Sequence, residues 1–203
     1  MSEKPDPVKT RRTLILLAAV SLLPFVGAVL LYVFWTPQSA TNYGELIDPV
    51  PLAPVALAQT DGQEFRFASL RGQWAFLMTD AGKCDEHCRA KLYLMRQIRL
   101  TLGKDQDRLV RVWIIDDGVT PDPGALAEFS GTRTVLLSQG NFAGQLPARG
   151  SPRDHVFLVD PFGNLMMRLP RDADLSKVKK DMLKLMKISS GWVQVPGAQK
   201  AVP

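Results

Sequence analysis

The chain has 203 residues, of which 46% are hydrophobic and 22% are charged, and its net charge is +5. This length suits one ordinary domain with some additional chain, and the near-average composition excludes collagen-like, largely disordered and disulfide-dense proteins. With 2 Cys and 2 His, at spacings unlike those of a finger, a structural zinc site is excluded as well.

The first element is predicted to be a transmembrane helix. Residues 13–35 carry no charge and are mostly Leu, Val, Ala, Ile and Phe. Such a helix measures about 34 Å, enough to cross a hydrocarbon core of about 30 Å. The preceding stub, residues 1–12, has more basic than acidic residues, which predicts a cytoplasmic N-terminus. A cleaved signal peptide is the alternative, but the apolar run is long for one, and Gln38 occupies the −3 position of the obvious cleavage site.

Strands and helices alternate in the remainder. Residues 36–54 are rich in Pro and predict an extended linker, residues 55–188 the domain, and residues 189–203 a flexible tail. Strands are predicted at 55–57, 65–67, 74–78, 109–115, 134–137, 156–159 and 165–169. Helices are predicted at 84–102, 122–129 and 174–187. This order predicts an α/β domain with a mixed sheet covered on both faces.

Nucleic acid is not an expected partner. Outside the stub, no basic run approaches the stripe that binds a phosphate backbone. Several lysines fall in the last predicted helix and are interpreted as a solvated face. They are Lys177, Lys179, Lys180, Lys184 and Lys187.

The two cysteines are the sharpest chemical feature of the sequence. Cys84 and Cys88 lie four residues apart at the start of a predicted helix, after the strand 74–78. On a regular helix their Cα atoms would be about 6 Å apart, a distance that a disulfide accepts. A helix N-terminus stabilises a thiolate, although Asp85 and Glu86 oppose this. A metal site, a redox-active dithiol and a structural disulfide all remain open.

The two histidines and an acidic pair are the other candidate site residues. On a helix His87 lies about 300° round from Cys84, so the histidine and both sulfurs converge only if the turn unwinds. His155 precedes a strand, where a packed or surface histidine is the simpler interpretation. Asp116 and Asp117 end a strand at the same sheet edge, and we expect them to be solvated.

Together these features resemble the SCO/SenC group of proteins. The resemblance rests on the apolar anchor, the strand 74–78, the Cys84-xxx-Cys88 turn and the Asp160-Pro161-Phe162-Gly163 hairpin. The segments 41–47 and 92–97 further resemble a divergent bacterial branch of small membrane-anchored proteins. The resemblance implies a thioredoxin-like fold and a role in cytochrome c oxidase assembly, by copper delivery or thiol chemistry at the copper site.

The same resemblance implies a copper site. Its ligands would be Cys84, Cys88 and His155, with His87 as the alternative histidine. The family's prolines beside each cysteine are absent from this sequence. The histidine is also offset by an odd number of residues, which on a strand reverses the face of the side chain. Either the preceding loop is shortened and re-registered, or His155 is not a ligand.

Three functions follow as expectations. The first is an assembly factor, rather than an enzyme, anchored by one helix in the bacterial inner membrane. Its domain would lie in the periplasm, and its partner would be a cytochrome c oxidase subunit or another assembly factor. The second is a thiol–disulfide oxidoreductase in which Cys84 attacks and Cys88 resolves. The third is a non-catalytic scaffold in which Cys84 and Cys88 form a structural disulfide.

Overall fold

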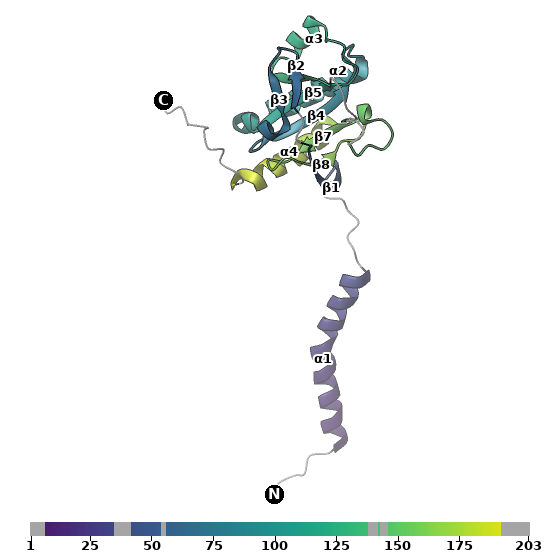
Figure 1. Ribbon diagram of the computed structural model, residues 1–203. Helices are drawn as coiled ribbons and strands as arrows, with labels where there is room; N and C mark the ends of the chain where they lie inside the picture. The colour runs from purple at the N-terminus through teal and green to yellow at the C-terminus, as the bar shows by residue number, and fades with distance from the viewer. Residues whose placement is uncertain (1–6, 35–41, 54–55, 138–141, 143–145, 192–203) are drawn as a thin grey trace, which may run out of the picture. The chain divides into compact units, whose positions relative to one another are not determined.

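A computed structural model describes residues 7–34, 42–53, 56–137, 142 and 146–191. The chain divides into two compact units, with the boundary between Thr41 and Asn42. The first contains helix α1 and the second contains a single sheet with its covering helices (Figure 1).

Helix α1, Pro7–Phe34, contains the predicted apolar segment as far as Phe34, and the last predicted residue, Trp35, lies outside the described residues. Its stretch Arg11–Phe34 has a mean hydropathy of 2.7, and its length and composition are those of a helix that can cross a membrane. The helix begins before the predicted start at residue 13, because Lys and Arg are good helix formers and Pro7 fits the first helical position.

The sheet of the second unit has eight strands in the order β1-β8-β7-β4-β5-β6-β2-β3. The strands are β1 Glu45–Pro51, β2 Ala56–Gln59, β3 Glu64–Arg66, β4 Trp74–Asp80, β5 Leu109–Ile115, β6 Thr132–Leu136, β7 Val156–Val159 and β8 Asn164–Arg168. Strands β4, β5 and β6 pair in parallel, and the other neighbours pair antiparallel. The mixed sheet predicted from the sequence is therefore confirmed.

Hydrophobic clusters lie on both faces of the sheet. Helices α2 (Glu86–Thr101) and α4 (Leu175–Ile188) pack together on one face, against Trp74, Phe76 and Met78 of β4. The alternate residues of β4 face the other cluster, which is covered by the short helix Phe67–Leu70 and by Phe142 and Leu146. Helix α3 (Pro123–Glu128) follows β5. Strand β4 is buried along its whole length, so its carboxyl end is firmly placed.

The predicted linker at residues 36–54 is wrong over its second half, because strand β1 lies within it and pairs with β8. Strand β1 is at the edge of the sheet, where a proline such as Pro49 or Pro51 costs no ladder hydrogen bond on the open side. The other end also extends further than predicted, since the buried Ser189 accepts a hydrogen bond from Trp74 Nε1 at 3.0 Å. The remainder of the predicted tail lies outside the described residues.

Candidate functional site

The cysteine pair lies at the carboxyl end of β4. After β4 ends at Asp80, the chain turns, and Asp85 caps helix α2 by accepting a hydrogen bond from the Cys88 backbone N–H at 2.8 Å. Cys84 therefore precedes the helix and Cys88 lies in its first turn. The two form a disulfide with a Cα–Cα distance of 5.2 Å. The spacing in the sequence correctly predicts that the two sulfurs meet.

The two sulfur-bearing residues differ in their access to solvent. Cys88 is fully buried in the cluster beneath α2, whereas Cys84 is only half-buried. Cys84 borders a groove of about 340 Å³. The groove is lined by Gly82, Lys83, Cys84, Arg89, Val119, Thr120, Asp122 and Ala125. A partner arriving from solution therefore meets Cys84 first, and Cys88 only through it.

A close approach of two loops fixes the turn before Cys84. The Gly82 N–H donates to Asp117 Oδ1 at 2.9 Å, and the Val119 N–H donates to the same oxygen at 3.0 Å. A Cβ atom at Gly82 would lie 1.8 Å from the Val119 carbonyl oxygen. Burial raises the pKa of Asp117, but these backbone hydrogen bonds outweigh it and leave the pKa below its usual value. Asp117 is exposed, as expected from the sequence, and its carboxylate also holds the two loops together through these hydrogen bonds.

Between the end of β4 and helix α2 lies a buried ion pair that sequence reasoning missed. Lys91 Nζ is 2.7 Å from Asp80 Oδ2, and the two side chains are only 4% and 9% exposed. Lys91 also donates to the Arg153 carbonyl oxygen. Burial lowers the pKa of Lys91, although the pair with Asp80 opposes this shift. The sequence feature that could have revealed the burial of Lys91 is its position in the helix. Lys91 lies on the same helical face as Cys88 and Leu92, which are buried.

Asp116 joins this ion pair to the neighbouring strand. Its carboxylate accepts hydrogen bonds from Thr79 Oγ1 at 3.0 Å and from Arg153 Nε and Nη2 at 2.9 and 2.5 Å. The same hydrogen bonding raises the pKa of Arg153. The predicted solvation of Asp116 is therefore wrong, because its side chain is only 11% exposed and holds a bidentate partner. The result is a charged network that connects β4, β5 and α2.

The structure does not bring His155 to the sulfurs. Its Nδ1 lies 2.9 Å from the Leu169 carbonyl oxygen and its Nε2 lies 3.3 Å from that of Arg149. A ring nitrogen that faces a carbonyl oxygen cannot bind a metal unless the ring moves. The residue lines a separate groove of about 350 Å³. That groove is formed by Tyr43, Glu45, Arg149, His155, Arg168, Leu169, Pro170 and Arg171.

The groove at His87 differs from the groove at Cys84. His87 borders its groove with Asp85, Glu86 and Ala90, and that groove includes neither cysteine. Its Nε2 is buried and has no hydrogen-bond partner among the described residues. Within the same residues, no three Cys, His, Asp or Glu side chains are grouped so as to hold a metal ion. The described geometry, with its disulfide, therefore does not fit a three-ligand copper site.

Comparison with protein families supports the fold. A family model described as a transmembrane-like, thioredoxin-like C-terminal domain matches residues 74–189, more than half of the chain. This segment begins with β4 and ends after α4, so it contains both cysteines and His155. A comparison with curated proteins gives no match.

Solved structures of Sco proteins and of a thiol:disulfide interchange protein are similar to the chain. Copper-bound Sco1 from yeast is 20% identical, with 76% of this chain and 100% of the yeast chain covered and a TM-score of 0.56. BsSco, described as a Sco cytochrome c oxidase assembly protein with a disulfide switch, is 15% identical, with coverages of 72% and 98% and a TM-score of 0.55.

The third similar structure is a putative thiol:disulfide interchange protein DsbE from Chlorobium tepidum. It is 19% identical, with 69% of this chain and 98% of that chain covered and a TM-score of 0.55. The predicted resemblance to SCO/SenC proteins is therefore confirmed. At these identities, the similarity establishes the fold, and function has to be argued from the site.

Proposed function

The chain belongs to the family of transmembrane-like, thioredoxin-like C-terminal domains, and from this premise we propose that it is a membrane-anchored thiol–disulfide exchange protein. The observation that carries the proposal is the unequal access to the disulfide. Cys84 borders an open groove, and its partner Cys88 is buried in the core. A purely structural disulfide gains little from closing so short a loop, since the stabilisation grows with loop length.

The exchange conserves electrons between two pairs of sulfur atoms, the Cys84–Cys88 pair of this protein and a pair of thiols in the client. A client thiolate attacks Sγ of Cys84, the Cys84–Cys88 bond breaks, and its electron pair leaves on Sγ of Cys88, which takes up a proton. A second client thiolate then attacks the mixed disulfide and releases Cys84 as a thiolate, so the client is oxidised and this protein is reduced. In the opposite direction, Cys84 attacks a client disulfide and Cys88 resolves the intermediate.

We further propose a location and a class of client, both of which rest on the resemblance to Sco proteins. The domain lies in the periplasm of a bacterium, with α1 in the inner membrane and the N-terminus in the cytoplasm. The client is the cysteine pair of a cytochrome c oxidase copper site, on an oxidase subunit or carried by another assembly factor. In this role the protein is an assembly factor that prepares thiols for a metal.

Copper binding by this chain through Cys84, Cys88 and either His155 or His87 stays a prediction. Two thiolates and an imidazole suit copper in its common oxidation states. The disulfide and the position of His155 do not supply this set as described. No step of the exchange above depends on copper.

A trapping experiment on the full-length protein tests the proposal. In Cys88→Ser, a mixed disulfide between Cys84 and its client has no resolving thiol, so it should accumulate and be recovered intact after acid quenching. The matched variant Cys84→Ser should trap nothing. Recovered clients should include oxidase subunits or assembly factors.

The reduction potential provides an independent measurement. Structural disulfides have reduction potentials below about −300 mV. Equilibration of the full-length protein with glutathione buffers should give a reduction potential above that value. A lower potential, together with equal recovery from both cysteine variants, would show that the disulfide is only structural.

A further inference from the structure

We propose that the lysine-rich outer face of helix α4 binds anionic lipid headgroups of the bilayer that α1 crosses. This face, called the α4 lysine face below, is a shallow groove of about 500 Å³. It is lined by Ser176, Lys179, Lys180, Leu183, Lys184 and Lys187. The proposal is independent of the disulfide chemistry.

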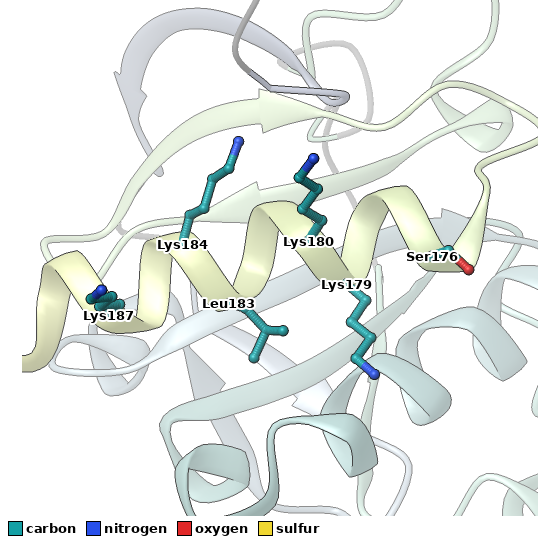
Figure 2. A pocket seen from close by; sticks show the side chains of 6 residues that line it. All are labelled: Ser176, Lys179, Lys180, Leu183, Lys184 and Lys187. Atoms are coloured by element: carbon teal, nitrogen blue, oxygen red, sulfur yellow. The ribbon is translucent and has the colours of Figure 1, made fainter.

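The arrangement of side chains on α4 is that of an interfacial helix. Val178, Met182 and Met186 are buried against the sheet, and the lysines lie on the opposite side. Figure 2 shows Lys180 and Lys184 on one side of the helix and Lys179 and Leu183 on the other, with a common outward face between them. A basic face with an apolar residue at its centre is typical of helices that lie on anionic membranes.

The apolar component of this face is exposed in the domain. Leu183 is 44% exposed, and Ile188 at the end of the helix is 65% exposed. Lysine side chains have long apolar stems, so such residues can enter the headgroup layer together while the ammonium groups meet lipid phosphates. None of the ion pairs among the described residues involves Lys179, Lys180 or Lys187.

The chain that arrives from α1 is fastened to α4 itself. The Tyr43 and Gly44 N–H groups donate to the buried Asp181 carboxylate at 2.6 and 3.0 Å. The Tyr43 hydroxyl accepts from the Asp174 N–H at 3.1 Å, and Lys177 Nζ lies 5.1 Å from the centre of the Tyr43 ring. Helix α4, which carries the lysines, is thus the element to which Tyr43 and Gly44 are hydrogen-bonded. These two residues are called the anchor segment below.

Covalent geometry then places a limit on how far this helix can be from the bilayer. Helix α1 ends at Phe34 and the anchor segment meets α4 at Tyr43. The nine Cα–Cα steps from Phe34 to Tyr43 span at most about 32 Å even when fully extended. A basic helix in a domain tethered to the membrane by so short a segment encounters anionic headgroups at a high effective concentration. This constraint favours lipid over a freely diffusing acidic protein as the occupant.

The test uses the full-length protein in nanodiscs of phosphatidylcholine, with or without phosphatidylglycerol. Lysine acetylation by an uncharged reagent is followed for each residue by mass spectrometry. We expect Lys179 and Lys184 to react about threefold more slowly in discs that contain phosphatidylglycerol. The protection should disappear near 1 M salt, where the Debye length falls to about 3 Å. Lys83 and Lys104, exposed elsewhere on the domain, serve as internal controls.

Two matched variants test whether the face acts as a unit. In Lys180→Gln/Lys187→Gln, Lys179 and Lys184 remain as reporters and should lose their protection, whereas Lys83→Gln/Lys104→Gln should leave it unchanged. An unaltered melting curve verifies that the fold persists. Equal acetylation in both kinds of disc would overturn the proposal. So would equal protection of the control lysines, or protection that requires an added acidic protein.

Discussion

In the turn between β4 and Cys84, called the cysteine turn below, Gly82 is the position with the least room for a side chain. The Val119 carbonyl oxygen occupies the position that a Cβ would take, and the same loop supplies the Asp117 carboxylate that holds the Gly82 N–H. Because Cys84 follows two residues later and lines a groove with Val119, any shift of this contact changes the surroundings of the sulfur. The absence of a Cβ atom at Gly82 therefore influences access to the disulfide.

Gly82→Ala should destabilise the domain by about 1–3 kcal/mol, because the backbone of one loop must move to relieve the overlap. It should also change the rate at which a small disulfide reagent reacts with reduced Cys84. Chemical denaturation and stopped-flow kinetics measure the two effects.

The matched control for this prediction is Gly62→Ala, remote in sequence from the cysteine turn. Gly62 has a φ of 83° and no atom within 4 Å of its added Cβ, so the change costs about 1–2 kcal/mol of backbone strain. It should leave the thiol kinetics unaltered. If both variants alter the kinetics equally, the effect is general and not local to the Gly82 contact.

At the scale of elements, Lys91 and Asp80 attach helix α2 to the end of strand β4. Both side chains are almost completely buried, and the pair is extended by Thr79, Asp116 and Arg153. A buried pair of this kind adds little over well-packed apolar groups but is costly to break on one side. Its position suits a role in setting the angle at which α2 presents Cys88.

Lys91→Met should lower the free energy of unfolding by about 3–5 kcal/mol, because it leaves the Asp80 carboxylate buried without its cation. The double variant Lys91→Met/Asp80→Asn should recover most of that loss. Urea unfolding of the full-length protein in detergent is the measurement. A loss in the double variant as large as in the single one would contradict an ion-pair origin.

The pH dependence of stability offers a second readout of the same pair. The pKa of Lys91 is lowered from its ordinary value of 10.5, so the unfolded state binds more protons between the folded-state pKa and 10.5. The contribution of Lys91 to stability should therefore increase as the pH rises through that interval. Lys91→Met should remove this increase.

At the scale of the whole molecule, the domain carries its chemistry and its anchor on different elements. The disulfide lies between β4 and α2, whereas the anchor segment directly precedes β1 and the α4 lysine face belongs to α4. His155 lines the groove that includes Tyr43 and Glu45, so it belongs to the anchor side of the domain in this structure. This division separates the predicted third copper ligand from the two sulfurs.

Copper retention by the reduced full-length protein distinguishes a ligand from a packed histidine. We expect His155→Ala to keep its affinity for copper(I) in competition with a chelator, and to lose about 1–3 kcal/mol of stability through its two carbonyl contacts. The Cys84→Ser control should lose copper if the sulfurs bind it. A large loss of copper in His155→Ala at unchanged stability would instead show that the imidazole moves to join the cysteines on reduction.

The sequence predicts the strand and helix order, the apolar helix and the meeting of Cys84 with Cys88, because all three depend on local patterns of hydrophobicity and spacing. It also predicts α4 and its lysine face. It fails where the deciding contact is distant in the chain. Strand β1 resembles a linker because of its prolines, and only its pairing with β8, more than a hundred residues later, makes it a strand.

The surroundings of the charged residues were likewise decided by tertiary structure alone. Asp116 finds Arg153, Asp117 finds Gly82, and Lys91 finds Asp80 only once the chain has folded. Whether a carboxylate or an ammonium group is solvated depends on desolvation and partners, neither of which is encoded in its immediate neighbours. The same holds for His155, whose residue type suits a metal ligand while its position against two carbonyl oxygens is set by the packing of the domain.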